Sequence, residues 1–286
     1  MAQDTLKKAF ILGHPVRQSR SPKIHQFWLE ELKLEGSYEA IDILPENLNT
    51  FLSSMKQNGF AGGNVTAPHK QETFRFVQQS GVLTSRALKI GAVNTLYFEN
   101  DQIVGDNTDA LGFIANLDQK LGENWRFDVA TLLVIGAGGA ARAVIAGLLE
   151  NSGSRILISN RTRERAEALV AMEPERIDVV DWADIESAIA KSDLLVNTTT
   201  LGMEGKEGNF PFSLTKARND ALVTDLVYVP LETPFLRAAQ SRGLRTVDGL
   251  GMLLHQAVPG FEHWFGKKPI VTEALRAVIL DDLFKK

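Results

Sequence analysis

A lysine follows the segment GGNVTAPHK (62–70) at a place where a side chain can reach a ligand. Pro68 has no backbone N–H and cannot continue a central strand, so the predicted strand over 60–67 ends close to it. Lys70 then lies at the mouth of the sheet, where α/β proteins gather their ligands. An amine at that position can donate a proton to an oxygen that develops negative charge, or accept one when it is neutral.

Further polar side chains occur where the neighbouring predicted strands end. They are Asn64 and Thr66 in the same segment, Asn94 in GAVNT, and Asn107, Thr108 and Asp109 in GDNTDALGF. Each one alone has a structural explanation, because Asp109 can cap a helix and Asn94 can form a turn. Their joint occurrence at the ends of successive strands favours a polar binding site.

Two serines stand in the segment GHPVRQSRSPKIH (13–25), just before a proline. Pro22 suits the first position of a helix and Ser21 suits the N-cap, which explains Ser21 on structural grounds. Ser19 has no such explanation. Two hydroxyl groups at a helix N-terminus can hold a carboxylate, and the helix dipole favours the same charge.

A glycine-rich turn, VIGAGGAARA (134–143), follows an apolar run and opens a helix-like segment. Gly136, Gly138 and Ala141 match the G-x-G-x-x-G/A pattern of dinucleotide-binding turns. The first glycine permits the turn, the second lets a pyrophosphate approach the backbone, and the small third residue lets helix and strand pack closely. Free N–H groups at the helix start then face the anion. The pattern predicts a nucleotide site; the alternative is a tight strand–helix turn without a ligand.

The next predicted strand, over 155–160, decides which nucleotide fits. NAD-binding proteins usually end this strand with an acidic residue that binds the ribose hydroxyls. Here it runs into NRTRER (160–165), with Arg161, Arg163 and Arg165. Guanidinium groups bind phosphate in a bidentate manner, so a 2′-phosphate is the natural partner. The segment therefore favours NADP(H) over NAD(H), the alternative being a solvated helix start.

Hydrophobic periodicity predicts the elements that position these residues. In the first third, strands are expected over 9–13, 38–43, 60–67 and twice within 92–107, and helices over 24–32, 45–58, 70–79 and 83–89. From residue 130 the alternation becomes more regular, with strands expected over 131–136, 155–160, 177–180, 193–197, 221–228 and 245–249, and helices between them. Two final helices, near 250–264 and 271–285, have no strand after them and are expected to pack on the first domain. This pattern predicts a two-domain α/β fold: an N-terminal α/β domain and a Rossmann-like, doubly wound parallel sheet.

Composition excludes several classes of protein. The 286 residues are 44% hydrophobic and 23% charged, and the net charge is −4. No long basic tract suggests nucleic acid, and the absence of cysteine excludes disulfides and thiolate metal sites. The apolar run 10–12 is too short for a signal peptide or a membrane span, so a cytoplasmic location without membrane contact is expected. The five histidines lack metal-ligand spacing, so no metal site is expected.

Seven of these motifs together resemble one known family. They are SRSPKIH, GGNVTAPHK, GAVNT, GDNTDALGF, VIGAGGAARA, NRTRERA and DGLGMLLHQA. The set, in this order and over nearly the whole chain, is similar to shikimate dehydrogenase. The resemblance implies NADPH-dependent reduction of 3-dehydroshikimate to shikimate in aromatic amino-acid biosynthesis, with a small-molecule substrate as the partner. The expected state is a monomer or a homodimer.

The same resemblance implies the roles of particular residues. Lys70 and Asp109 would be the catalytic pair. The substrate site would be lined by Ser19, Ser21, Thr66, Asn94, Tyr228 and Gln256. The cofactor would contact Gly136, Ala137, Gly138, Gly139, Ala140, Asn160, Arg161, Thr162, Arg163, Glu164, Arg165, Leu226 and Gly249. A substrate-binding and catalytic domain is expected over 1–109 with 248–286, and an NADP-binding domain over 110–247.

Reduction of a ketone places negative charge on its oxygen, which a proton donor stabilises. The expected donor is Lys70, with Asp109 orienting it and binding a substrate hydroxyl. Because opposite charges in contact titrate together, the two groups are treated as one coupled unit.

Two departures from the family pattern are present: NTTT (197–200) where relatives often have Asn-Ala-Thr-Ser, and Val229 where many have Asn. The first keeps small hydroxyl side chains and casts little doubt on cofactor binding. Three alternatives stay open. They are an enzyme that also acts on quinate, with NAD; a non-catalytic sensor of NADP(H) or shikimate; and a methylene-tetrahydrofolate dehydrogenase, which would want a more aromatic pocket than 8% aromatic residues suggest.

Overall fold

The computed structural model describes residues 6–205 and 210–285, and the chain forms two compact units. The first unit is Met1–Thr108 with Gln256–Lys286, and the second is Asp109–His255. From the sequence, Asp109 and residues 248–255 are expected in the first unit. The structure groups them with the second, because helix α11 (Leu250–His255) packs along α5 (Asp109–Leu121).

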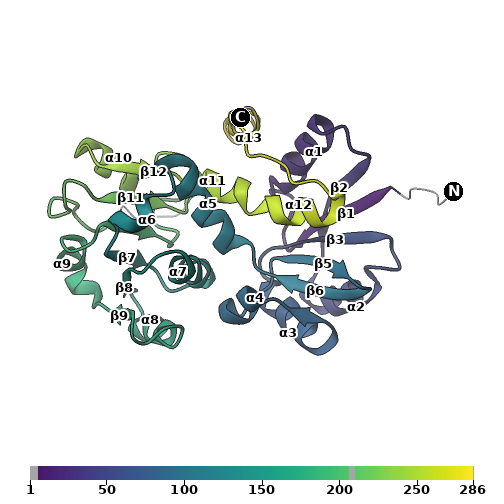
Figure 1. Cartoon of the computed structure of the whole chain (residues 1–286), viewed down its shortest axis with the longest axis horizontal. Coiled ribbons are helices and arrows are strands. Elements are labelled where there is room, and N and C mark those ends of the chain that lie inside the picture. Colours follow the sequence, from purple (N-terminus) through teal and green to yellow (C-terminus); the bar gives the residue numbers. More distant parts are fainter. Residues whose placement is uncertain (1–5, 206–209, 286) are drawn as a thin grey trace. The chain divides into compact units, whose positions relative to one another are not determined.

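The first unit is built on a mixed sheet of six strands (Figure 1). The strands are β1 (Lys7–Gly13), β2 (Gly36–Asp42), β3 (Phe60–Val65), β4 (Val82–Leu83), β5 (Thr95–Glu99) and β6 (Gln102–Asp106). Their order is β2-β1-β3-β5-β6-β4. The pairs that β1 makes with β2 and β3 are parallel, whereas β5 is antiparallel to both β3 and β6. The predicted strand pair around residues 99–101 is confirmed, and β4 is an additional short strand.

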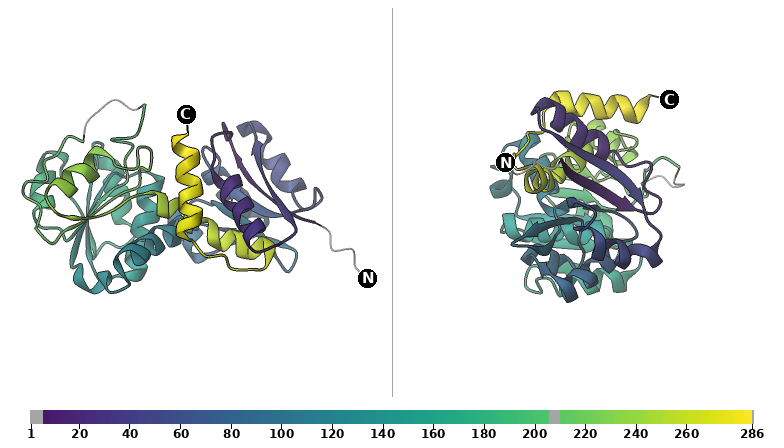
Figure 2. Two further views of the ribbon diagram at one scale, coloured as in Figure 1. Left: turned by 90° about the horizontal axis from the view of Figure 1, so that it is seen from above. Right: turned by 90° about the vertical axis from the view of Figure 1, so that its right-hand side faces the viewer.

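Helices cover this sheet on both faces. They are α1 (Ser21–Glu31), η1 (Pro45–Asn47), α2 (Leu48–Ser54), α3 (Lys70–Ser80), α4 (Ser85–Ile90), α12 (Ala257–Phe265) and α13 (Glu273–Phe284). Leu48, Leu52 and Val77 join Phe10 and Leu96 in one core cluster. Helix α12 packs on β1, β3 and β5, and α13 lies along α1 (Figure 2). Of the two segments expected on the first unit, 271–285 packs there, whereas 250–264 does so only from residue 257 on, because α11 belongs to the second unit.

In the second unit, the described residues form one sheet of six strands that are all parallel. They are β7 (Thr131–Ile135), β8 (Arg155–Ser159), β9 (Ile177–Val179), β10 (Leu194–Asn197), β11 (Leu222–Asp225) and β12 (Arg245–Val247). The order is β12-β11-β10-β7-β8-β9. The first strand of the unit along the chain therefore lies at the centre of the sheet, and the chain winds outward from it in both directions, which is the Rossmann arrangement. The predicted doubly wound sheet is confirmed.

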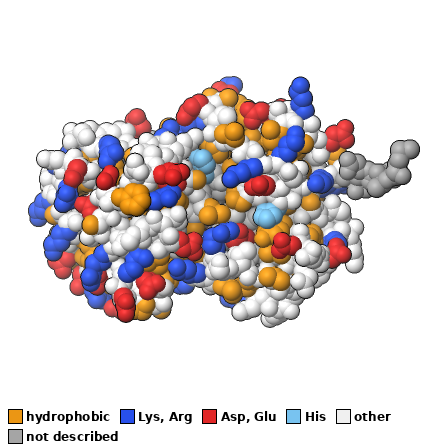
Figure 3. Space-filling model, in the orientation of Figure 1, with side chains coloured by type: hydrophobic (Ala, Val, Ile, Leu, Met, Phe, Trp, Pro, Cys, Tyr) orange, Lys and Arg blue, Asp and Glu red, His pale blue; other side chains and the backbone are white. Residues whose placement is uncertain are grey.

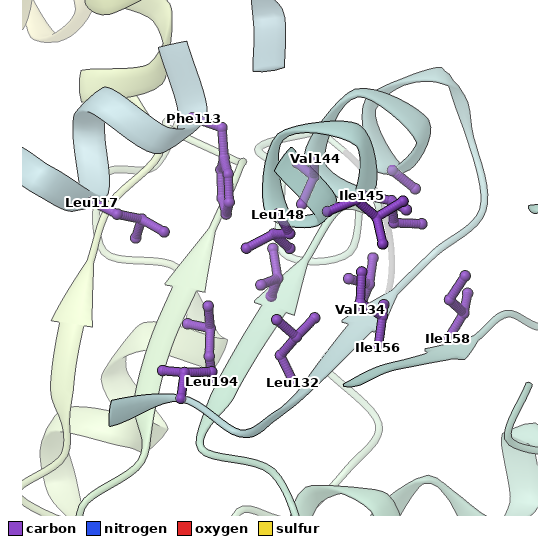
Figure 4. Packing of buried hydrophobic residues seen from close by; sticks show 14 of the residues in the cluster. Phe113, Leu117, Leu132, Val134, Val144, Ile145, Leu148, Ile156, Ile158 and Leu194 are labelled. Carbon is purple, nitrogen blue, oxygen red and sulfur yellow. The ribbon is translucent and has the colours of Figure 1, made fainter. Parts of the chain in front are cut away.

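Helices cover both faces of the second sheet. The remaining helices of this unit are α6 (Trp125–Asp128), α7 (Gly139–Asn151), α8 (Arg163–Val170), η2 (Trp182–Asp184), α9 (Ile185–Ile189) and α10 (Pro234–Ser241). Along β7, Leu132 and Val134 face α5 and α7 (Figure 4). Leu133 and Ile135 face α9 and α10. Successive strand residues point to opposite faces, so a strand between two helical layers is apolar throughout. This explains the uninterrupted run TLLVI.

Two local expectations were wrong. The single helix expected over 250–264 is two helices, α11 and α12, and Gln256 stands between them at the boundary of the units. Ser21 is the first residue of α1 rather than its N-cap; the cap position is Arg20, with Pro22 just inside. The Ser21 side chain is buried, so its hydroxyl faces other protein atoms rather than solvent.

The visible face of the molecule carries Lys and Arg interspersed with Asp and Glu (Figure 3). Such mixing does not create the single-sign field that attracts polyanions. Across residues 6–205 and 210–285, no helix combines the length and apolar character needed to cross a membrane.

Candidate functional site

Lys70 is the first residue of α3, and its main chain is held by neighbouring elements. Its carbonyl oxygen accepts a hydrogen bond from the Val93 N–H at 2.9 Å. His69, one residue earlier, is buried, and its Nε2 donates to the Ile43 carbonyl oxygen at 2.7 Å. The imidazole therefore anchors the start of α3. These contacts fix the backbone from which the Lys70 amine extends.

Asn94 is the centre of a buried hydrogen-bond network in the first unit. Its Oδ1 accepts from the Thr108 N–H at 2.8 Å and from the Thr95 hydroxyl at 2.8 Å. Its Nδ2 lies 3.5 Å from Gln256 Oε1, and the Gln256 carbonyl accepts from the Thr108 hydroxyl at 2.8 Å. The structure thus brings together two predicted substrate residues, Asn94 and Gln256, from distant parts of the chain. It also fixes Thr108, directly before Asp109.

A second chain of hydrogen bonds leads from Tyr38 to Asn94. The Ser21 side chain lies near that of Tyr38, and the Tyr38 hydroxyl donates to Asn64 Oδ1 at 2.6 Å. Asn64 Nδ2 in turn donates to the Asn94 carbonyl oxygen at 3.2 Å. Burial raises the pKa of Tyr38 well above its usual value, so Tyr38 stays a neutral donor. Sequence reasoning missed Tyr38 and did not assign Asn64 a role; a tyrosine inside a predicted buried strand was the available signal.

Ser19 and Thr66 lie at the carboxyl ends of adjacent parallel strands. Thr66 follows β3, and its N–H donates to the Leu12 carbonyl oxygen on β1 at 2.9 Å. Ser19 follows β1; its N–H donates to the Val16 carbonyl oxygen at 2.9 Å, and its Oγ accepts from the Ser21 N–H at 3.2 Å. The carboxyl ends of parallel strands share one edge of a sheet, so both hydroxyls belong to the edge where Lys70 begins α3.

The glycine turn of the second unit has a blocked side and an open side. Gly136 adopts φ +112°, and a methyl group there would lie 2.5 Å from Thr198 Oγ1 and 3.0 Å from Thr199 Cγ2. Methyl groups at Gly138 or Gly139 would meet no protein atom within 4 Å. Ala141, the third position of the pattern, is fully buried in α7. The turn therefore packs tightly against Thr198 and Thr199 at Gly136 and leaves open space beside Gly138 and Gly139 at the N-terminus of α7, where a pyrophosphate would approach.

The arginines after β8 differ in their contacts. Arg163 forms ion pairs with Glu167 at 2.7 Å and with Asp181, and these hydrogen bonds raise its pKa above the usual value. Arg161 and Arg165 are exposed, and neither makes an ion pair with any residue within 6–205 and 210–285. A 2′-phosphate would thus find two unpaired guanidinium groups and one already neutralised. Asn160 Nδ2 donates to the Thr162 carbonyl oxygen at 2.7 Å and shapes this turn, in which Glu164 is also exposed.

Three predicted residues lie at the same carboxyl edge of the second sheet as the glycine turn. Leu226 follows β11, and its N–H donates to the Asn197 carbonyl oxygen at 3.0 Å. A methyl group on Gly249 would collide with the Leu226 carbonyl oxygen, so these two segments touch. Tyr228 is half-buried in the loop after β11.

The predicted site residues are divided between the two units. Lys70, Ser19, Ser21, Thr66, Asn94 and Gln256 belong to the first unit. Asp109, Tyr228 and all of the predicted cofactor residues belong to the second. Among the described residues, no group of three His, Asp or Glu side chains could hold a metal ion.

Three stretches match domains of known families. Residues 11–96 match the shikimate dehydrogenase substrate binding domain, residues 117–204 match shikimate/quinate 5-dehydrogenase, and residues 249–279 match the shikimate 5′-dehydrogenase C-terminal domain.

Full-length relatives are similar over nearly the whole chain. An NADP(+) shikimate dehydrogenase of Brucella abortus is 51% identical over 281 residues, 98% of this chain and 96% of the relative. The structure of a Thermus thermophilus shikimate 5-dehydrogenase with NADP(H) and shikimate has a TM-score of 0.83 at 36% identity, covering 95% of this chain and 99% of that one. A Corynebacterium glutamicum quinate dehydrogenase with NAD has a TM-score of 0.87 at 29% identity, covering 96% and 99%. The chain belongs to the shikimate dehydrogenase family.

Proposed function

We propose that this protein is an NADP-dependent shikimate dehydrogenase that reversibly reduces 3-dehydroshikimate to shikimate. The observation that carries the proposal is the 51% identity, over 98% of the chain, to an enzyme named for this activity and cofactor. The family assignment argues against a methylene-tetrahydrofolate dehydrogenase. It leaves quinate as a second substrate to be tested, because a quinate dehydrogenase shares the fold.

The second unit would hold the cofactor. The space above Gly138 and Gly139 fits a pyrophosphate on the N-terminus of α7, and the rest of the segment from Gly136 to Ala140 supplies its N–H groups. Arg161 and Arg165 would bind the 2′-phosphate. NADPH supplies the hydride when it is bound. The protein's part is to orient the substrate, exclude water and manage one proton.

Lys70 and Asp109 would manage that proton. The rigid support of Lys70 by Val93 and His69, and of Thr108 by Asn94, gives both residues fixed backbone origins. In the reducing direction the Lys70 ammonium donates its proton to the oxygen that becomes the alcohol, and in the reverse direction neutral Lys70 accepts it. Asp109 would orient the amine and bind a neighbouring hydroxyl.

The substrate has one carboxylate and several hydroxyls, and the predicted side chains are hydroxyls and amides. Ser19 and Ser21 would hold the carboxylate, aided by the N-terminus of α1. Thr66, Asn94, Gln256 and Tyr228 would bind hydroxyls. The buried network around Asn94 supports this role, because its members orient one another by hydrogen bonds.

The activity is tested with purified protein and shikimate by following absorbance at 340 nm. NADP⁺ should give rapid reduction, NAD⁺ much less, and quinate in place of shikimate little. Equal kcat/KM values with quinate and shikimate would move the assignment to a quinate enzyme. Binding of NADPH without turnover of either substrate would favour the sensor alternative.

The role of Lys70 is tested by Lys70→Ala. Loss of the proton donor should lower kcat by about 10²–10⁴-fold and change the KM for shikimate much less. Lys89→Ala is a matched control, because Lys89 is also a half-buried lysine on a helix of the first unit, in α4. A rise in KM at unchanged kcat would show that Lys70 binds the substrate without transferring the proton.

The cytoplasmic location and the monomeric or homodimeric state stay predictions. Cell fractionation tests the first, and light scattering on the purified protein tests the second.

A further inference from the structure

Asp225, the last residue of β11, is a fully buried carboxylate that no step of the proposed reaction uses. Its Oδ1 accepts from Asn197 Nδ2 at 2.9 Å and from the Val227 N–H at 3.0 Å. Its Oδ2 accepts from the Thr233 hydroxyl at 2.7 Å. One side chain thereby joins the end of β10, the loop after β11 and the start of α10.

The contacts of Asp225 extend to the underside of the glycine turn. Asn197 Oδ1 accepts from the Thr199 N–H at 3.1 Å and from the Thr199 hydroxyl at 2.7 Å. Thr199 is one of the two residues that lie against Gly136. The loop on the other side of Asp225 contains Leu226, whose carbonyl touches Gly249. Every loop at this edge of β10, β11 and β12 is therefore one or two contacts from the Asp225 carboxylate.

The negative charge on Asp225 does not by itself favour folding. Burial raises the pKa of Asp225 to about 6, and its partners Asn197, Val227 and Thr233 are all uncharged. No Lys, Arg or His within 6–205 and 210–285 forms an ion pair with it. A buried charge without a counter-ion costs more than a neutral side chain of the same shape. The carboxylate is better explained by the three donors that it orients than by a contribution to stability.

The strand order indicates which half of the cofactor these loops would meet. In the Rossmann arrangement the dinucleotide crosses the sheet where the strand order reverses, here between β7 and β10. The adenosine ribose would then lie at the end of the strand after the glycine turn, which is β8, where Arg161 and Arg165 follow. The nicotinamide half must then extend over the loops after β10 and β11.

We propose that Asp225 is a positioning residue for the nicotinamide half of NADP(H), holding the loops after β10 and β11 in their binding conformation. The inference rests on the proposed function. It requires no contact between Asp225 and the cofactor; the carboxylate acts through the Val227 N–H, Asn197 and Thr233.

The test is Asp225→Asn, which keeps the shape and removes the charge. The substitution weakens the three hydrogen bonds to residue 225, because hydrogen bonds to a charged acceptor are stronger than those to a neutral one. The loops should then be held less firmly, and the Kd of NADPH, measured by fluorescence titration, should rise roughly tenfold. The Kd of adenosine 2′,5′-bisphosphate, which contains only the adenosine half, should be unchanged. The melting temperature at pH 8 should not fall, because a neutral side chain replaces an unfavourable buried charge.

Two controls separate positioning from general damage. Asp193→Asn alters a carboxylate at the opposite end of β10, where Oδ2 accepts from the N–H groups of Ala130 and Thr131, both at 2.9 Å. It should leave both dissociation constants unchanged. Thr233→Val removes one donor to Asp225 and should raise the Kd of NADPH, whereas Thr233→Ser keeps the hydroxyl and should bind as the wild type does.

Two results would overturn the inference: an NADPH Kd within twofold of wild type in Asp225→Asn, or equal losses of NADPH and of adenosine 2′,5′-bisphosphate. The first removes any role in binding, and the second indicates a role in folding of the whole site. Failure of the wild-type protein to bind NADPH would instead contradict the proposed function.

Discussion

Two glycines of the β7–α7 turn should respond in opposite ways to the same substitution by alanine. Gly136 has φ +112°, and its added methyl group would meet Thr198 Oγ1 at 2.5 Å. Gly138 has φ −87° in an extended conformation, and its added methyl group would meet nothing within 4 Å. The first site is thus closed by the protein itself, and the second is open for a ligand.

Gly136→Ala combines backbone strain with overpacking. A positive φ costs a residue with a side chain about 1–3 kcal/mol, and overpacking costs about another 1–3 kcal/mol. The free energy of unfolding should fall by about 2–6 kcal/mol, which lowers the melting temperature by roughly 4–24 °C. Thermal unfolding followed by circular dichroism measures this change.

Gly138→Ala should instead stabilise the free protein by about 0.4–1 kcal/mol, because alanine restricts the unfolded chain. Its methyl group would occupy the space through which a pyrophosphate reaches the backbone. If this costs about 1–3 kcal/mol, the Kd of NADPH rises roughly 5- to 150-fold.

Gly153→Ala is the control, because Gly153 also has open space around it but precedes β8 at the opposite edge of the sheet. It should change neither the melting temperature nor the Kd by much. The reasoning is refuted if Gly138→Ala lowers the melting temperature as much as Gly136→Ala, or if it binds NADPH with wild-type affinity.

Three further outcomes are expected. Arg161→Ala and Arg165→Ala should each raise the KM of NADP⁺ by about tenfold or more and leave the KM of NAD⁺ unchanged. Arg163→Ala should have a smaller effect, because Arg163 is already paired with two carboxylates. Equal effects on both cofactors would contradict a 2′-phosphate contact. Ser21→Ala should raise the KM of shikimate more than it lowers kcat, because the carboxylate is bound in both ground and transition states; steady-state kinetics decide. The pKa of Asp225 is raised from 3.8 in the unfolded chain to about 6 in the folded protein. Between these pH values the folded protein binds more protons than the unfolded chain, so the free energy of unfolding falls as pH rises, by about 3 kcal/mol in all. Urea titrations from pH 4 to 8 should show this loss in the wild type and not in Asp225→Asn.

Most of the second unit's fold could be predicted from the sequence because its signals are local. Runs such as TLLVI and RILIS are apolar without alternation, which marks strands buried on both faces, and the glycine pattern marks the first strand–helix turn. The break between α11 and α12 could not be predicted in this way. Residues 250–264 are helical throughout in local preference, and the division at Gln256 follows from packing of α11 on α5 and of α12 on the first sheet.

For the candidate site, the sequence by itself determined which side chains are available: the lysine after a strand-ending proline, the hydroxyls before α1, the glycines and the arginines. Only the tertiary structure decided how they are supported. Asn64 connects Tyr38, 26 positions away, to Asn94, 30 positions away, and Asp225 accepts a hydrogen bond from Asn197, 28 positions away. A hydrogen bond depends on a separation of about 3 Å in space, and distance along the chain does not specify it.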